Sequence, residues 1–197
     1  MLSKSARFEM KGPPTTSEDF DRAYRKPVTF WGDIRTPPEI KAMARGQGSA
    51  LELGCGVGRF SRYLARQGLR VTAVDFSPVA IGKARASAIQ EGLQVHFLVG
   101  NVTQLDALDG PFNMSFDVGC FHCLDASAQR GYVSEVFRLL EPGGIHLIWV
   151  LDEPPSGIAL SPRVLETTFG SGFALQDARP SRRRLVRSHW YWLQRRA

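Results

Sequence analysis

Three glycines stand close together in the run Gly54-Cys55-Gly56-Val57-Gly58. A tight turn between a strand and a helix requires glycine, because glycine adopts positive φ angles and lets a ligand lie against the backbone. A carboxylate, Asp75, follows 21 residues after Gly54. An acid at the end of the next strand can accept hydrogen bonds from two ribose hydroxyls. This combination predicts a nucleotide site.

The spacing of these glycines indicates which nucleotide is bound. A dinucleotide fingerprint reads G-x-G-x-x-G, whereas the third glycine here comes one residue early and Arg59 takes its place. Glu52 precedes the turn, and a carboxylate there would repel a pyrophosphate but suits a ligand with an amine and a sulfonium. S-adenosylmethionine carries both groups, so the pattern favours it over NAD or FAD. An ordinary strand-to-helix turn without a ligand is the remaining alternative.

Two other side chains could remove a proton during group transfer. His122 lies in the run Cys120-Phe121-His122-Cys123-Leu124, directly after an apolar segment, and Asp152 follows another such segment. Methyl transfer needs a general base only when the acceptor must lose a proton, and such a base contributes about 10²–10⁴-fold. We therefore predict His122 as the catalytic residue, with Asp152 as a second candidate. The alternative is a loop histidine that only packs.

The elements that must position these residues alternate along the chain. Apolar runs predict strands, and apolar residues three to four apart predict helices. The expected strands span 49–53, 69–74, 94–99, 116–121 and 145–151, with two more between 173 and 194. The expected helices span 17–25, 36–45, 58–67, 77–92, 127–140 and 161–169. A tight turn is expected at Pro142-Gly143-Gly144.

Strands that alternate with helices imply a parallel sheet covered by helices on both faces. We expect an α/β fold of the Rossmann-like, doubly wound kind, with about seven strands. The last two strands have no helix between them, so they are expected to form an antiparallel hairpin at the sheet edge. The predicted organisation is a single domain, with an N-terminal arm and helical lid at 1–45 and the ligand-binding domain at 46–197.

Composition limits the partners of the protein. The chain has 197 residues, of which 43% are hydrophobic and 22% charged, and this suits one buried core. The net charge of +6 and the arginines near the C-terminus raise the question of nucleic acid. We favour a solvated edge strand with outward arginines, because the sequence holds no zinc finger, RNA-recognition signature or lysine-rich tail.

The three cysteines are Cys55, Cys120 and Cys123. An odd number without a paired framework argues against a disulfide scaffold and for a reducing compartment. Cys120 and Cys123 have CxxC spacing but no second pair, so no metal site is predicted. We find no apolar run of 18 residues and no apolar leader, so a cytoplasmic protein with no membrane span is expected.

These motifs resemble those of the class I S-adenosylmethionine-dependent methyltransferases over residues 45–152. The run Ala50-Leu51-Glu52-Leu53-Gly54-Cys55-Gly56-Val57-Gly58-Arg59 is similar to their first motif, which is the most specific part of the match. Residues 71–77 are similar to their second motif. The segments that resemble the motifs of the third, fourth and fifth strands are Gly100-Asn101-Val102, Phe116-Asp117-Val118 and Leu140-Glu141-Pro142-Gly143-Gly144.

The resemblance implies a role for each matching residue. From one end of the cofactor to the other, these are Glu52, Gly54, Cys55 and Gly56 at the methionine, Asp75 at the ribose, and Phe76, Asn101 and Val102 at the adenine. Cys120 or Phe121 would face the sulfonium methyl. Asn101 stands where the family commonly has Asp, and its amide oxygen can still accept a bond from the adenine amino group.

An aromatic stretch at residues 27–33 is similar to the lid of small-molecule methyltransferases of the thiopurine, halide and tellurite-resistance type. Those enzymes also tend to show a run like Phe121-His122-Cys123-Leu124 after the fourth strand. The resemblance implies that Phe30 and Trp31 cover the cofactor or the substrate. The alternative is that both rings simply pack on the core.

The sequence therefore predicts a methyltransferase that uses S-adenosylmethionine and releases S-adenosylhomocysteine. The expected acceptor is a sulfur, oxygen, nitrogen or halide nucleophile of a small molecule, with no nucleic acid partner. The protein would be a monomer or a homodimer. Two alternatives stay open: an RNA or protein methyltransferase that uses the basic C-terminal edge, and a cofactor-binding module without catalysis.

Overall fold

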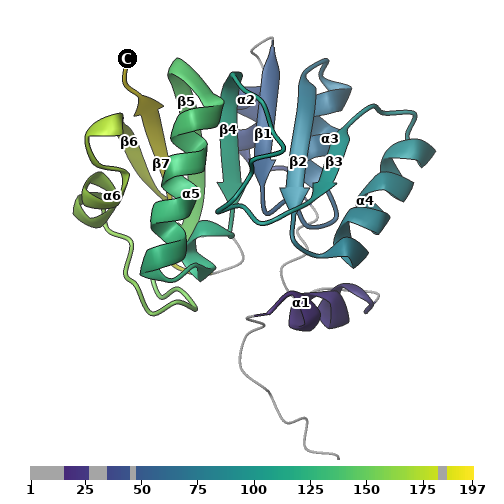
Figure 1. Ribbon diagram of the computed structural model, residues 1–197, viewed down its shortest axis with the longest axis horizontal. Helices are drawn as coiled ribbons and strands as arrows, with labels where there is room; N and C mark the ends of the chain where they lie inside the picture. The colour runs from purple at the N-terminus through teal and green to yellow at the C-terminus, as the bar shows by residue number, and fades with distance from the viewer. Residues whose placement is uncertain (1–15, 27–34, 45–47, 182–185) are drawn as a thin grey trace, which may run out of the picture.

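The computed structural model describes residues 16–26, 35–44, 48–181 and 186–197. Within these ranges the strands form one seven-stranded sheet in the order β3-β2-β1-β4-β5-β7-β6 (Figure 1). The strands are β1 (Ser49–Leu53), β2 (Arg70–Asp75), β3 (His96–Val99), β4 (Phe112–Val118), β5 (Leu140–Leu151), β6 (Phe173–Ser181) and β7 (Ser188–Arg195). Strands β1 to β5 pair in parallel, and β7 runs antiparallel between β5 and β6. The predicted Rossmann-like doubly wound sheet and its C-terminal hairpin are confirmed.

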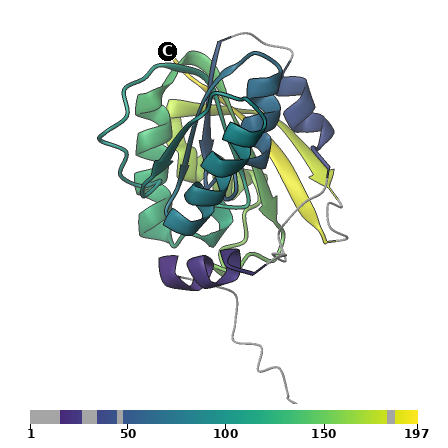
Figure 2. The same ribbon diagram turned by 90° about the vertical axis from the view of Figure 1, so that its right-hand side faces the viewer.

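Helices cover both faces of the sheet (Figure 2). The helices are α1 (Ser17–Tyr24), α2 (Pro38–Met43), α3 (Arg59–Arg66), α4 (Pro78–Gln90), α5 (Ala126–Leu139) and α6 (Pro162–Phe169), with short 3₁₀ turns at Phe121–Cys123 and Gly170–Gly172. Ile40 of α2, Leu64 of α3 and Ile81 of α4 are buried on one face. Tyr132 of α5 and Leu165 of α6 are buried in a separate cluster on the other.

The sequence marks where the helices that follow the strands begin. Ser77 accepts a hydrogen bond from the amide of Ala80 and so caps α4, with Pro78 in its first turn. Asp125 caps α5 in the same way by accepting from the amide of Ala128. These caps start the helices directly after the strand ends and therefore place the turns at the carboxyl edge of the sheet.

Parallel pairing brings the ends of three strands together. Leu53 at the end of β1 lies opposite Val74 of β2 and opposite Asp117 of β4. The residues that follow these three positions therefore emerge side by side. This edge is the place where ligands bind in open α/β sheets.

Two local expectations are corrected. Pro142, Gly143 and Gly144 do not form a separate turn but lie inside β5 as an irregularity. The step from Leu140 to Ile145 on β5 is five positions, whereas the facing step from Phe112 to Met114 on β4 is two. Gly143 has a φ of +82°, which lets the strand take up the extra residues. The helix expected at 17–25 is α1, which ends one residue earlier, at Tyr24, and is capped by Thr16, whose side chain accepts from the amide of Asp19.

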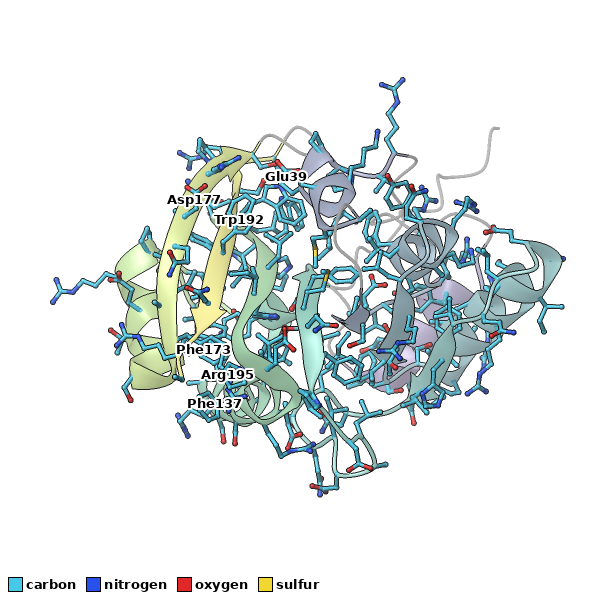
Figure 3. All side chains as sticks on the ribbon, turned by 90° about the horizontal axis from the view of Figure 1, so that it is seen from above. Glu39, Phe137, Phe173, Asp177, Trp192 and Arg195 are labelled. Atoms are coloured by element: carbon cyan, nitrogen blue, oxygen red, sulfur yellow. The ribbon has the colours of Figure 1, made fainter. Side chains whose placement is uncertain are left out.

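Two arginines of the C-terminal hairpin pack over aromatic rings, and Figure 3 labels one of them, Arg195, beside Phe137. The Arg195 guanidinium lies 4.3 Å from the ring centroid of Phe137. Arg179 lies 4.8 Å from the ring of Trp192 in the same way. Residues 182–185, which include three of the arginines near the C-terminus, lie outside the described ranges. None of the helices that the structure describes is long and apolar enough to cross a membrane.

Candidate active site

The glycine turn between β1 and α3 has a backbone that other residues adopt poorly. The φ angles of Gly54, Gly56 and Gly58 are +70°, +53° and +67°. A Cβ on Gly54 would lie 2.4 Å from the Cβ of Cys120, and one on Gly56 would lie 2.6 Å from the hydroxyl oxygen of Tyr24. Side chains at these positions would therefore be strained and would also collide.

Asp75 joins the end of β2 to this turn. Its Oδ2 accepts from the Gly56 amide at 2.7 Å, and its Oδ1 accepts from the Ser77 amide at 2.9 Å. Burial raises the pKa of Asp75 to about 6, against the effect of both hydrogen bonds. Each carboxylate oxygen has a second lone pair, so the group can still accept two hydroxyl protons. This capacity fits the ribose diol that the sequence assigns to Asp75.

Glu52 is buried on β1, with 2% of its surface exposed. Its Oε2 accepts from the Ser61 amide at 2.9 Å and from the Ser61 hydroxyl, in the first turn of α3. Burial raises the pKa of Glu52 to about 8, and the charges of Asp75 and Asp117 act in the same direction. A cationic ligand near this carboxyl would favour its ionised form.

The segment after β3 approaches the same edge. The Oδ1 of Asn101 accepts from the amide and the hydroxyl of Thr103, at 3.0 and 2.9 Å. The amide oxygen that was expected to meet an adenine amino group therefore already has two donors. Val102 is buried in the core beneath it. The side-chain amide nitrogen is therefore the group of Asn101 that can still bind a ligand.

The turn after β4 carries three of the predicted site residues, Cys120, Phe121 and His122, and it is anchored by Asp117, which was not among the predicted site residues. Asp117 is fully buried, and its two oxygens accept from the amides of Cys120 and Phe121 at 2.7 and 2.6 Å. Cys120 therefore lies against Gly54, and Phe121 is buried. His122 is 4% exposed, and its Nδ1 accepts from the Leu151 amide at 3.2 Å.

Helix α1 lies beyond the carboxyl ends of the strands, beside the start of α4 (Figure 1). Asp21 accepts from the Ser77 hydroxyl and, at 3.4 Å, from the Val79 amide. Lys83 of α4 donates to the carbonyl of Tyr24. The helix is therefore held against the start of α4 from its middle and from its C-terminal end, and it places the Tyr24 hydroxyl over Gly56.

Phe76 is the predicted adenine contact, and α1 shapes its surroundings. Its ring is 38% exposed and lies 5.1 Å from the ring of Phe20, in an edge-to-face arrangement. The Ser17 hydroxyl donates to the Phe76 carbonyl at 3.2 Å. An aromatic pair thus stands at the end of β2, where the resemblance puts the adenine.

Of the remaining predicted residues, one is paired with another side chain and two lie outside the described ranges. Asp152 pairs with His189, with 2.7 Å between its Oδ1 and the ring Nδ1. Phe30 and Trp31 lie in the segment 27–34, outside the described residues. Among the residues that the structure does describe, no three His, Cys, Asp or Glu side chains gather as metal ligands.

Sequence reasoning missed Tyr24 and Asp21 on α1, and it gave Asp117 no role. An acid that follows a phenylalanine at the end of an apolar strand is a signal for Asp117, since a buried carboxylate must find donors. No comparable signal exists for Tyr24, because its contact with Gly56 joins segments 32 residues apart in the chain.

Comparison with known proteins supports a cofactor-dependent group transfer. Residues 50–144 match a family model described as "Methyltransferase domain". The chain is 31% identical over 127 residues to the 2-heptyl-1-hydroxyquinolin-4(1H)-one methyltransferase of Mycobacteroides abscessus, covering 62% of this chain and 56% of that protein. It is 34% identical over 139 residues to a ubiquinone biosynthesis O-methyltransferase of Xanthomonas axonopodis pv. citri, covering 70% and 57%. The chain therefore spans a little over half the length of these curated relatives.

The fold is also shared with a solved methyltransferase. The N-methyltransferase NodS of Bradyrhizobium japonicum, in complex with S-adenosyl-L-homocysteine, superposes with a TM-score of 0.75 over 92% of this chain and 99% of that chain. The identity is 16%, so this likeness shows the fold alone. These findings show that residues 50–144 match a methyltransferase domain and that the chain shares the fold of a solved methyltransferase.

Proposed function

We propose that this protein transfers the methyl group of S-adenosylmethionine to a hydroxyl group of a small aromatic molecule. The observation that carries the proposal is the juxtaposition of the glycine turn, the Asp75 carboxylate and the turn that bears Cys120. The names of the two curated relatives support oxygen as the acceptor, since one is an O-methyltransferase and the other acts on a hydroxyquinolone. Membership of the thiopurine, halide and tellurite-resistance branch stays a prediction.

The residues at this edge fit the cofactor. Asp75 has lone pairs for the two ribose hydroxyls, and Glu52 can supply negative charge beneath the glycine turn. Phe76 and the Asn101 amide nitrogen would face the adenine, with the Val102 backbone beside them. Helix α1 would cover the bound ligand, which gives the predicted lid a physical basis.

S-adenosylmethionine supplies, when bound, a methyl group already activated by the positive sulfur. The protein therefore has to hold the acceptor in line with that methyl group and to exclude water, and such orientation is worth roughly 7–11 kcal/mol in favourable cases. Cys120 and Phe121 would form the wall between cofactor and acceptor, because Cys120 contacts Gly54 directly.

A hydroxyl acceptor must also lose its proton, and we propose His122 for this role, with Asp152 as the second candidate. The neutral His122 ring accepts at Nδ1 from Leu151 in this structure, so Nε2 carries the ring proton. To act as a base, the ring must first release the Leu151 amide, because Nδ1 holds its only basic lone pair. Nδ1 then takes the proton of the acceptor directly, or the ring changes tautomer and Nε2 takes it. Asp152 would act only after separating from His189.

The proposed function is tested by measuring S-adenosylhomocysteine release over a panel of acceptors. Hydroxyquinolones, catechols and phenols are expected to be methylated in preference to thiols, amines and halides. With His122→Ala, hydroxyl acceptors should lose more rate than thiols if the ring is the base. Cofactor binding without turnover on any member of the panel would contradict the proposed function, and a clear preference for thiols or halides would replace its acceptor class.

A further inference from the structure

A chain of buried polar side chains crosses the core beside the active site. Its members are Ser115 and Asp117 on β4, His146 on β5 and Tyr132 on α5, and none of them is more than 1% exposed. The Ser115 hydroxyl lies 2.8 Å from His146 Nδ1, and His146 Nε2 lies 3.1 Å from the Tyr132 hydroxyl. That hydroxyl donates to Asp117 Oδ2 at 3.1 Å.

The protons of this chain have one consistent arrangement. Asp117 accepts from Tyr132 and from two backbone amides, so all of its partners are donors and the carboxylate is ionised. The Tyr132 oxygen must then accept from His146 Nε2–H. His146 Nδ1 in turn accepts from Ser115. Burial lowers the pKa of His146 to about 3, which agrees with the neutral ring that this order requires.

The chain ends on the backbone of the turn that faces the glycines. The two amides held by Asp117 belong to Cys120 and Phe121, and Cys120 is the residue in contact with Gly54. If these side chains served only to stabilise the core, apolar side chains would do as well, because buried hydrogen-bonded groups contribute little net free energy of folding. The polar chain instead fixes the position of one backbone segment.

We propose that Asp117, held by Tyr132 and His146, is a positioning residue that sets where the turn with Cys120 and Phe121 stands relative to the glycine turn. This inference rests on the proposed function, because its purpose is to align the acceptor with the cofactor. Asp117 itself is buried beneath the turn and acts through the two amides.

Asp117→Asn is the sharpest test, because it keeps the volume of the side chain. The amide has one oxygen, so in either orientation one of the two turn amides faces an NH₂ group and loses its acceptor. Tyr132→Phe removes one donor to Asp117 and leaves the turn amides bound. Ser115→Ala is the matched control, because it removes a buried hydrogen bond at the far end of the same chain.

The three cysteines supply a measurement that needs no acceptor. The rate of alkylation by iodoacetamide is measured at each cysteine by mass spectrometry. The rates at Cys120 and Cys123 report how accessible the turn after β4 is, and the rate at Cys55, which is buried in the glycine turn, reports opening of the whole fold. Asp117→Asn should speed the labelling of Cys120 by about fivefold or more with Cys55 unchanged. Ser115→Ala should change neither rate.

Turnover and binding complete the test. Asp117→Asn should lower kcat by about tenfold or more. Tyr132→Phe should lower it by less, and Ser115→Ala by under about twofold. The Kd for S-adenosylhomocysteine should stay within about threefold of the wild-type value in all three variants. Two results would show a purely structural role and overturn the inference: a loss of kcat that is accompanied by faster labelling of Cys55, or equal effects of Asp117→Asn and Ser115→Ala. If the wild-type protein binds S-adenosylhomocysteine without turnover, the proposed function fails, but the labelling rates still decide whether Asp117 positions the turn.

Discussion

The turn after β1 and the turn after β4 lie in contact at the carboxyl edge of the sheet, and they are held by different means. The turn after β1 takes its shape from three glycines with positive φ angles. The turn after β4 takes its position from Asp117, which holds two of its amides, and from a chain of buried side chains behind that acid. The first is determined by local backbone conformation and the second by tertiary contacts.

The difference shows what each turn can tolerate. A backbone that only glycine adopts is disturbed by any Cβ, whatever the rest of the core does. A turn anchored by side chains from β4, α5 and β5 is disturbed from a distance, through residues that touch neither ligand. The two turns meet where Gly54 contacts Cys120, so changes there should have the largest effect on ligand binding.

The largest effect is expected for Gly54→Ala. The new Cβ would lie 2.4 Å from the Cβ of Cys120, at a φ of +70°, so the two turns must separate. We expect the affinity for S-adenosylhomocysteine, measured by titration calorimetry, to fall about 100-fold or more, which corresponds to roughly 2.7 kcal/mol.

Gly92→Ala is the control for backbone strain alone. Gly92 has a φ of +64°, and no atom lies within 4 Å of the position of its Cβ. This variant should lose about 1–2 kcal/mol of stability and keep its affinity. Equal affinity losses in both variants would mean that contact between the two turns does not matter for the cofactor.

A smaller effect is expected for Asp75→Ala, which loosens only the first turn. The change removes the acceptor of the Gly56 amide and, on our proposal, the partner of the ribose hydroxyls. Cofactor affinity should fall about tenfold or more. Asp109→Ala, at an exposed acid, should leave it unchanged. An unaltered Kd for Asp75→Ala would remove Asp75 from the site.

The last prediction concerns stability rather than ligand affinity, and it depends on the carboxyl group beneath the glycine turn. The pKa of Glu52 is raised from 4.5 to about 8, so between these values the folded state keeps a proton that the unfolded state has lost. The free energy of unfolding should therefore fall as pH rises, by up to about 1.4 kcal/mol per pH unit, until pH passes about 8.

The window from pH 6.5 to 8 isolates this carboxyl. Burial raises the pKa of Asp117 and of Asp75 only to about 6, so both are largely ionised there. Chemical denaturation across the window should show a shallower slope for Glu52→Gln than for the wild type, and an unchanged slope for Asp117→Asn. Parallel curves for Glu52→Gln and wild type would mean that Glu52 is already ionised at pH 6.5.

Much of the glycine-turn region could be read from the sequence. The sequence predicts that the glycine turn and Asp75 lie close together, because the turn follows the end of one predicted strand and Asp75 follows the end of the next. Asn101 follows β3, as the sequence predicts, but the bond of its amide oxygen to the Thr103 amide could not be foreseen. That bond belongs to a local turn. The residue types alone do not show whether this turn or a ligand takes the amide oxygen.

The chain by itself determined the order of strands and helices, the parallel sheet and the glycine turn, because these follow from short-range periodicity and from backbone angles that few residues adopt. Only the tertiary structure decided that α1 lies over Gly56 and that Asp117 anchors the turn with Cys120. Both arrangements join residues far apart in the sequence. Their free energy comes from burial and hydrogen bonding between segments, which no local pattern records.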